Sequence, residues 1–231
     1  MKLKYGILCI FTFLIFDNLQ AQEGSWSVGP QAGIQFSKFY LFPEMAFGDF
    51  VDEFNQQSQY SLSTFLGVQF MRHTHTGGIW RSALNFEHKK GLIDEQDLAI
   101  NNGIQSEGTL KTFNEERYFT LELEKLLRIV SKDTWDFHLG LGPYLSYAID
   151  KQTRMFVDGE VIPSNDNDSI QSKRLELGAT ILSSLSLDLK DKASLQFMAF
   201  AKFPFSHWSL DEEQLGAFRS LGIRVGLNYF L

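Results

Sequence analysis

The stretch Ser25–Phe36 reads SWSVGPQAGIQF and alternates strictly between two kinds of residue. One set of alternate positions is apolar, from Trp26 to Phe36, and the other carries Ser, Gly and Gln. A period of two places successive side chains on opposite faces of a β-strand. The stretch therefore predicts a strand with one apolar and one polar face.

The same alternation recurs along the rest of the chain. Each repeat is long enough to cross a bilayer at a tilt, which takes about 9–11 residues. The sequence thus predicts an all-β fold, an eight-stranded antiparallel up-and-down transmembrane β-barrel; a hairpin hidden within residues 90–116 would raise the count to ten. The seven further strands are expected at Gln59–Met71, Gly78–Lys89, Arg117–Val130, Thr134–Ile149, Ser172–Leu189, Ala193–Phe205 and Ala217–Leu231.

The connections between these stretches alternate in length. Long ones cover about 37–58, 90–116 and 150–171, with a medium one at 206–216, and short ones fall at 72–77, 131–133 and 190–192. Short periplasmic turns and long outer loops are typical of bacterial outer-membrane barrels. Within the loops, Pro43–Gln56 is expected to form a short helix and Met155–Ile162 a small hairpin on Asp158-Gly159.

The composition narrows the classes of function. A formal net charge of −7 argues against nucleic acid as a partner, which would favour a basic face. The single cysteine, Cys9, allows neither an intrachain disulfide nor a cysteine-based zinc site. Aromatic residues make up 14% of the chain and Gly numbers 18, as an all-β protein rich in Phe and Gly would have.

The first residues are typical of a secretory signal peptide. Lys2 and Lys4 precede an apolar stretch at Ile7–Phe16, and a small residue, Ala21, stands before the expected cut. Cys9 lies inside the apolar stretch and not at the cut, which argues against a lipid anchor. We expect residues 1–21 to be a signal peptide, cleaved near Ala21, and residues 22–231 to form the barrel domain.

The polar faces of the strands predict the inside of the barrel. They are rich in glycine, which suits a narrow lumen, and they carry charges of both signs. Buried charges must be paired to be tolerated, so these residues are expected to form a polar network with a structural role. Its expected members are Arg81, Glu87, Glu122, Glu124, Asp136, Arg174, Glu176, Lys202 and Arg224.

Aromatic residues on the apolar faces collect near one end of their strands. An interfacial girdle at the periplasmic side of a membrane would have this arrangement. Its expected members are Trp26, Phe70, Trp80, Trp135 and Tyr229.

Several stretches carry a family resemblance. The last eight residues, Arg224–Leu231, resemble the terminal signal read by the barrel-assembly machinery, with Leu231 in place of the usual final aromatic. Tyr118–Leu123, Gly140–Tyr147 and the glycine-punctuated last strand resemble the PorT-like outer-membrane β-barrel family. The resemblance implies an outer-membrane barrel and no single activity, since members range from secretion-system components to proteins of unknown role.

Candidate chemical sites are weak. His73 and His75 flank one residue of a short connection without further ligands, and Asn165–Ser169 lacks the glutamate and glycine of a calcium loop. His88 and the stretch Ser206–Ser209 match no catalytic spacing, and Glu122 with Glu124 would pair with lumen arginines. No catalytic, metal or cofactor site is therefore expected, and no cofactor.

We expect a non-enzymatic protein of the bacterial outer membrane with a structural, assembly or interaction role through its long outer loops. Its expected partners are membrane lipid and lipopolysaccharide, the assembly machinery during biogenesis, and proteins that meet the outer loops. Three alternatives stay open at this point: a narrow, porin-like solute channel, a lipid-modifying enzyme, and a soluble exported barrel that binds a lipophile.

Overall fold

The computed structural model describes residues 25–41, 58–97, 109–157, 160–162, 174–190, 192–209 and 216–231. The expected signal peptide, the helix at 43–56 and the acidic turn at 165–169 lie outside these ranges. No helix among the described residues is long and apolar enough to cross a membrane. The strands are β1 (Trp26–Leu41), β2 (Ser58–His73), β3 (Ile79–Asp97), β4 (Thr109–Lys132), β5 (Trp135–Val157), β6 (Glu160–Ile162), β7 (Arg174–Lys190), β8 (Ala193–Ser209) and β9 (Gly216–Phe230).

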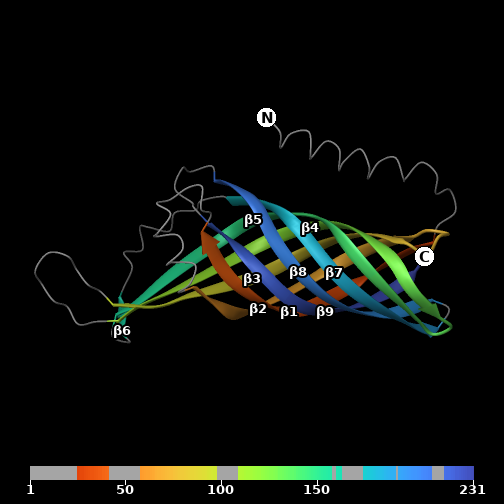
Figure 1. The fold of residues 1–231 in the computed structure, drawn as a ribbon, viewed down its shortest axis with the longest axis horizontal. Coiled ribbons are helices and arrows are strands. Elements are labelled where there is room, and N and C mark those ends of the chain that lie inside the picture. Colours follow the sequence, from red (N-terminus) through yellow and green to blue (C-terminus); the bar gives the residue numbers. More distant parts are fainter. Residues whose placement is uncertain are drawn as a thin grey trace, which may run out of the picture.

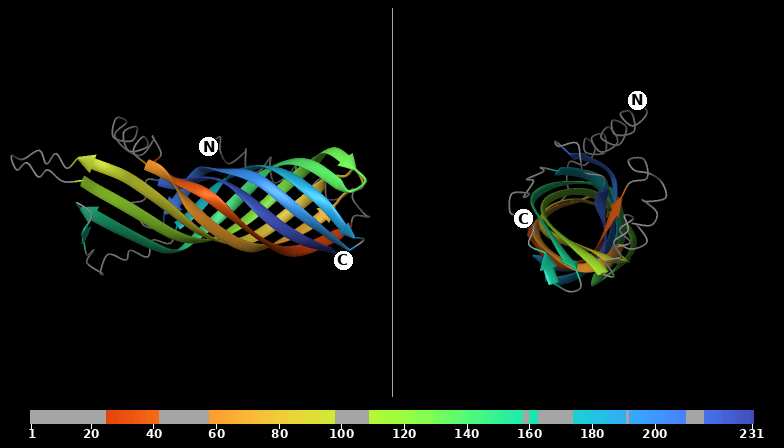
Figure 2. Two further views of the ribbon diagram at one scale, coloured as in Figure 1. Left: turned by 90° about the horizontal axis from the view of Figure 1, so that it is seen from below. Right: turned by 90° about the vertical axis from the view of Figure 1, so that its left-hand side faces the viewer.

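All strand pairings are antiparallel, and neighbours in the barrel follow one another along the chain. β1 pairs with both β2 and β9, and β4 pairs with β5, so β1–β5 and β7–β9 close into a ring of eight. The short β6 pairs with β5 outside that ring. The expected eight-stranded up-and-down barrel is confirmed, and Figure 2 shows the closed ring from one end.

The strand register sets the width of the barrel. A path of paired residues that starts at Trp26 on β1 returns to β1 at Phe36, ten residues further on, after passing Arg72, Trp80, Lys125, Leu141, Ile181, Ala201 and Leu221. With eight strands, this shear implies a tilt of about 40° and a backbone radius of about 8 Å. A cylinder this narrow is filled by side chains.

The two ends of the barrel differ. At one end, which we call the turn end, Thr74–Gly78 joins β2 to β3, Asp133–Thr134 joins β4 to β5, and Lys190 of β7 pairs with Ala193 of β8. At the other, the loop end, β3, β4 and β5 run on past the rest of the barrel (Figures 1 and 2). β4 has 24 residues and β5 has 23, against 16 in β1 and 15 in β9.

The expected boundaries at the loop end are wrong. Much of the expected loops at 90–116 and 150–171 is strand: Asp97 pairs with Thr109, and Leu110 with Val157. The two ends of 90–116 lengthen one hairpin and add no further strands to the ring, so the ten-strand alternative is also wrong. On β4 and β5, the side chains that the structure describes beyond Glu116 and Lys151 are all partly or fully exposed, so apolar and polar residues need not alternate there. The expected pairing within Met155–Ile162 is confirmed, because Met155 pairs with Ile162, and the expected turn at Asp158-Gly159 lies outside the described residues.

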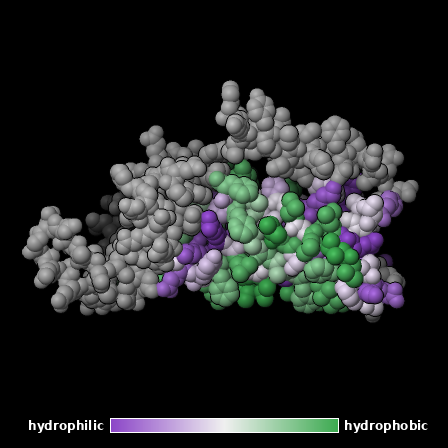
Figure 3. Space-filling model, in the orientation of Figure 1, coloured by the Kyte–Doolittle hydropathy of each residue, from purple (hydrophilic) through white to green (hydrophobic). Residues whose placement is uncertain are grey.

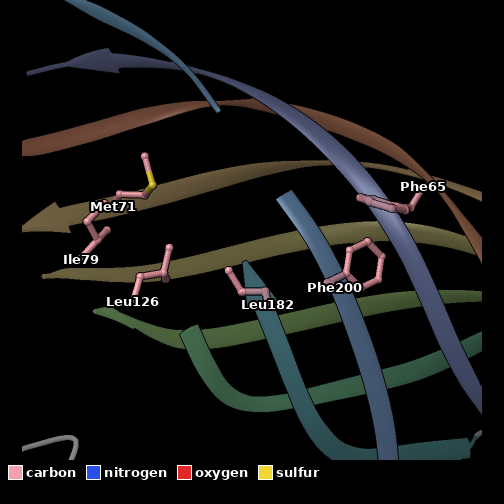
Figure 4. Packing of buried hydrophobic residues seen from close by; sticks show 6 residues of the cluster. All are labelled: Phe65, Met71, Ile79, Leu126, Leu182 and Phe200. Atoms are coloured by element: carbon pink, nitrogen blue, oxygen red, sulfur yellow. The ribbon is translucent and has the colours of Figure 1, made fainter. Parts of the chain in front are cut away.

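Small apolar clusters lie inside the barrel at two levels. One joins Phe65 and Phe200, whose ring centroids are 5.7 Å apart, to a group nearer the turn end. Figure 4 shows this cluster, formed by Phe65, Met71, Ile79, Leu126, Leu182 and Phe200. The second consists of Tyr118, Ala148 and Phe218, with Phe39 packed against it.

Close packing inside the narrow cylinder requires glycine at Gly33. A Cβ atom added there would lie 2.3 Å from the Ile223 carbonyl oxygen and 2.5 Å from the Phe65 ring. The Phe65 ring therefore occupies the space that a side chain at Gly33 would need.

We expect Gly33→Ala to lower the free energy of unfolding by about 1–3 kcal/mol, the usual cost of overpacking. Guanidinium unfolding followed by far-UV circular dichroism measures the loss. The matched control is Gly78→Ala, where the nearest atom to an added Cβ is 3.3 Å away. Equal effects of the two substitutions would contradict the packing argument.

Candidate functional site

The centre of the lumen is organised around the Glu122 carboxylate on β4. The Arg81 Nη1 atom lies 3.0 Å from it, the Lys202 Nζ atom 2.7 Å and the Arg224 Nη1 atom 2.5 Å. These cations come from β3, β8 and β9, so a single side chain connects four strands. All four residues are buried.

The Arg81 guanidinium extends the network toward the turn end. It forms an ion pair with Glu124 as well as Glu122. Its Nε donates to Gln69 at 2.7 Å and its Nη2 to Gln31 at 2.5 Å. The planar guanidinium thus donates to two carboxylates and two amides. The fixed arrangement of its N–H groups favours such simultaneous contacts.

A second group of ion pairs lies toward the loop end. Lys202 also pairs with Glu87, which lies 3.7 Å from the Lys89 Nζ atom. Lys89 in turn lies 3.2 Å from Glu176, and the Tyr144 hydroxyl donates to Glu176 at 2.9 Å. The network is therefore continuous from Glu124 to Glu176 along the lumen.

Aromatic rings cover this network at both levels. The Arg224 Cζ atom lies 4.3 Å from the centroid of the Phe200 ring and 5.8 Å from that of Phe65. The Lys89 Nζ atom lies 4.4 Å from the centroid of the Tyr118 ring. Rings at these distances attract cations, and they shield the ion pairs from water. The arrangement joins strands of the barrel together.

The structure brings seven of the nine expected network residues together: Arg81, Glu87, Glu122, Glu124, Glu176, Lys202 and Arg224. Asp136 lies apart at the turn end, where its Oδ1 atom has no hydrogen-bond partner among the described residues. Arg174 begins β7 at the loop end, and its side chain lies outside what the structure describes.

Sequence reasoning missed Lys89, Tyr144 and the amides of Gln31 and Gln69. All four occupy inward positions of their strands, in phase with residues that were chosen. Lys89, for example, follows Glu87 by two residues and shares its face. Extending the alternation on β3 by two residues would have added Lys89 to the predicted network. Nothing in the sequence indicates that the uncharged residues Tyr144, Gln31 and Gln69 contact the charged ones.

The structure places the five expected girdle residues at the turn end. Trp26, Phe70 and Tyr229 are each about half exposed on the exterior. Val28 pairs with both Phe70 and Tyr229, which sets these two rings on either side of β1. Trp80 follows the turn at Thr74–Gly78, and Trp135 follows Asp133–Thr134.

The other candidate sites do not assemble. His73 lies against Ser27 and the Phe230 ring, whereas His75 is exposed in the turn. His88 lies 3.6 Å from Glu115, and the side chains of Ser206, His207 and Ser209 are outside the described set. No group of three potential metal ligands occurs among the described residues.

Beyond the barrel, parts of four strands form what we call the projecting sheet: residues 94–97, 109–117, 150–157 and 160–162. Among the described residues, pairing of β3 with β2 ends at Ile93 and pairing of β5 with β7 ends at Ala148. The Phe113 and Phe156 rings pack edge to face across the sheet, with centroids 5.4 Å apart. Pairing among β3, β4, β5 and β6 therefore builds this sheet, and at its base the buried Glu116 accepts a hydrogen bond from the Tyr118 hydroxyl.

The closed fold and the distribution of its side chains define the structural class of this protein. The barrel is closed, the charged residues of the Glu122 network point inward, and large apolar residues on most strands point outward. On the face that Figure 3 shows, apolar residues form a band over the middle, with polar residues on either side of it. This is the architecture of transmembrane β-barrels of the outer-membrane type.

Comparisons with known proteins give similarities to solved structures. No family model matches it, and no curated protein does. Among solved structures, it is similar to OprG from Pseudomonas aeruginosa, with 13% identity over 91% of this chain and 97% of that one and a TM-score of 0.45. It is also similar to Neisserial surface protein A, with 11% identity over 90% and 99% of the two chains and a TM-score of 0.44. The similarity to Ail of Yersinia pestis has 8% identity, covers 91% and 100%, and gives a TM-score of 0.42.

We expect Glu122→Gln to lower the free energy of unfolding by about 3–5 kcal/mol, because it leaves buried cations without their shared partner. Guanidinium unfolding in detergent micelles measures the change. The matched control is Asp150→Asn, which removes the exposed pair with Arg117 at 3.0 Å. That substitution should cost less than about 1 kcal/mol. A loss for Glu122→Gln no larger than that of the control would contradict the network's role.

Proposed function

We propose that this protein is a non-enzymatic barrel of the bacterial outer membrane that presents its projecting sheet to a partner protein. The barrel serves as a rigid anchor, and the loop end faces away from the cell. Membership of the PorT-like family stays a prediction, carried by Tyr118–Leu123 and Gly140–Tyr147.

The exposed apolar residues of the barrel support a location in the membrane. Leu66 is 63% exposed, Leu141 68% and Ile181 58%, while Glu122 and Glu124 are fully buried. A protein in water places such residues the other way round, because exposed apolar surface is costly. A bilayer removes that cost for a closed barrel, whose backbone groups are paired within the ring. The same arrangement does not fit a soluble barrel with an apolar lipophile-binding interior.

The projecting sheet supports the interaction role. A strand needs about 9–11 residues to cross a bilayer, so β4 and β5 are longer than crossing the membrane requires. Among the described residues, the far edge of β6 and the edge of β3 beyond Ile93 lack a neighbouring strand. Strand edges of this kind accept an extended segment of another protein by main-chain hydrogen bonds.

The filled lumen favours this role over a narrow channel. The ion pairs around Glu122 lie against the Phe65 and Phe200 rings, and Lys89 further along the lumen lies against the Tyr118 ring. A path for solute would have to displace paired charges from both levels. We therefore propose that the barrel does not conduct.

Fractionation tests the membrane location. We expect the protein in the outer-membrane fraction, soluble only with detergent, with different gel mobility before and after boiling, because a closed barrel resists unfolding by detergent alone. Recovery without detergent and a single mobility would contradict the membrane location. The comparison of unboiled and boiled samples also serves as the folding control for every variant.

A photo-crosslinking residue at exposed Gln152, on the projecting sheet, tests the interaction role in intact cells. We expect protein adducts from this position and none from the control position Lys132, which is exposed at the turn end of β4.

Equal adducts at both positions would contradict a role for the projecting sheet. Stepwise currents from the purified protein in planar bilayers, altered by Glu122→Gln, would support the channel instead.

A further inference from the structure

Two tryptophans and two cations form one row on the exterior near the turn end. Trp26 on β1 pairs with Arg72 on β2, Arg72 with Trp80 on β3, and Trp80 with Lys125 on β4. The row crosses four neighbouring strands and alternates between indole and cation. These positions are in phase with the outward-facing residues of each strand, such as Phe70 and Leu84.

Each cation in the row lies over an indole. The Arg72 Cζ atom is 5.5 Å from the centroid of the Trp26 ring, and the Lys125 Nζ atom is 5.0 Å from that of Trp80. Both contacts lie within the range of cation–π attraction. The indoles therefore hold the two cationic groups against the surface of the barrel.

Lys125 lies within the apolar exterior. Its outward neighbours on β4 are Leu123 and Leu127, and its partner on β5 is Leu141, which is 68% exposed. Because the row climbs with the strand tilt, Lys125 lies about 9 Å further from the turn end than Trp26. A lysine facing hydrocarbon destabilises a barrel unless its charged group reaches the interface or an anion.

We propose that Arg72, Trp80 and Lys125 form a binding site for the phosphate of an anionic phospholipid in the leaflet at the turn end. The two charged members of the row are cations on either side of Trp80, which matches the charge of a phosphate group. Their N–H groups donate charge-assisted hydrogen bonds to phosphate oxygens, and the indoles lie at headgroup depth. The site rests on the proposed membrane location.

Native mass spectrometry of the full chain in detergent tests the site. The protein is titrated with phosphatidylglycerol and, separately, with phosphatidylcholine of the same acyl chains. We expect tighter binding of phosphatidylglycerol, weakened about tenfold by Lys125→Gln, as loss of one charge-assisted hydrogen bond implies. Lys125→Arg should keep the preference, and the control Lys132→Gln, at an exposed position outside the row, should leave it unchanged.

Equal binding of the two lipids, or equal losses for Lys125→Gln and Lys132→Gln, would overturn the site. Each variant is first shown to be folded by its mobility before and after boiling. A protein that dissolves without detergent would refute the membrane location itself, whereas a folded, detergent-dependent barrel without lipid preference would refute only this site.

Discussion

The pairing of Glu122 with three cations is the interaction on which the rest of the structure depends. Charged groups inside a narrow protein cylinder lose most of their hydration, and only close partners offset that loss. Arg81, Lys202 and Arg224 reach Glu122 from three other strands. The carboxylate thus links distant parts of the ring in addition to the hydrogen bonds between neighbouring strands.

The exterior follows from the same division of side chains. Since alternate residues face opposite sides, a strand that sends Glu122 and Glu124 inward must send Leu121 and Leu123 outward. A shear of ten leaves room inside for side chains and two small aromatic clusters. The lumen is consequently filled, and the projecting sheet at the loop end is the part of the protein that extends beyond it.

The sequence predicted the faces of the strands well because the lumen and the surroundings impose opposite demands on neighbouring residues. It predicted the loop end poorly. Residues such as Asn114 and Gln152 belong to strands, yet both are at least partly exposed, so no alternation marks them. The alternation along β3 could have predicted that Lys89 faces inward. The roles of Gln31 and Gln69, in contrast, depend on contacts with Arg81 that no periodicity reveals.

The sequence by itself determined the number of barrel strands, their order and which residues face inward, because a period of two is a local property of the chain. Only the tertiary structure decided which inward charges meet. The shear displaces each strand against the next, and it brings Glu122 to Arg224, 102 residues away, while Asp136 is left at the turn end. The same displacement sets Trp26, Arg72, Trp80 and Lys125 in one row, since register is a relation between strands and belongs to no single strand.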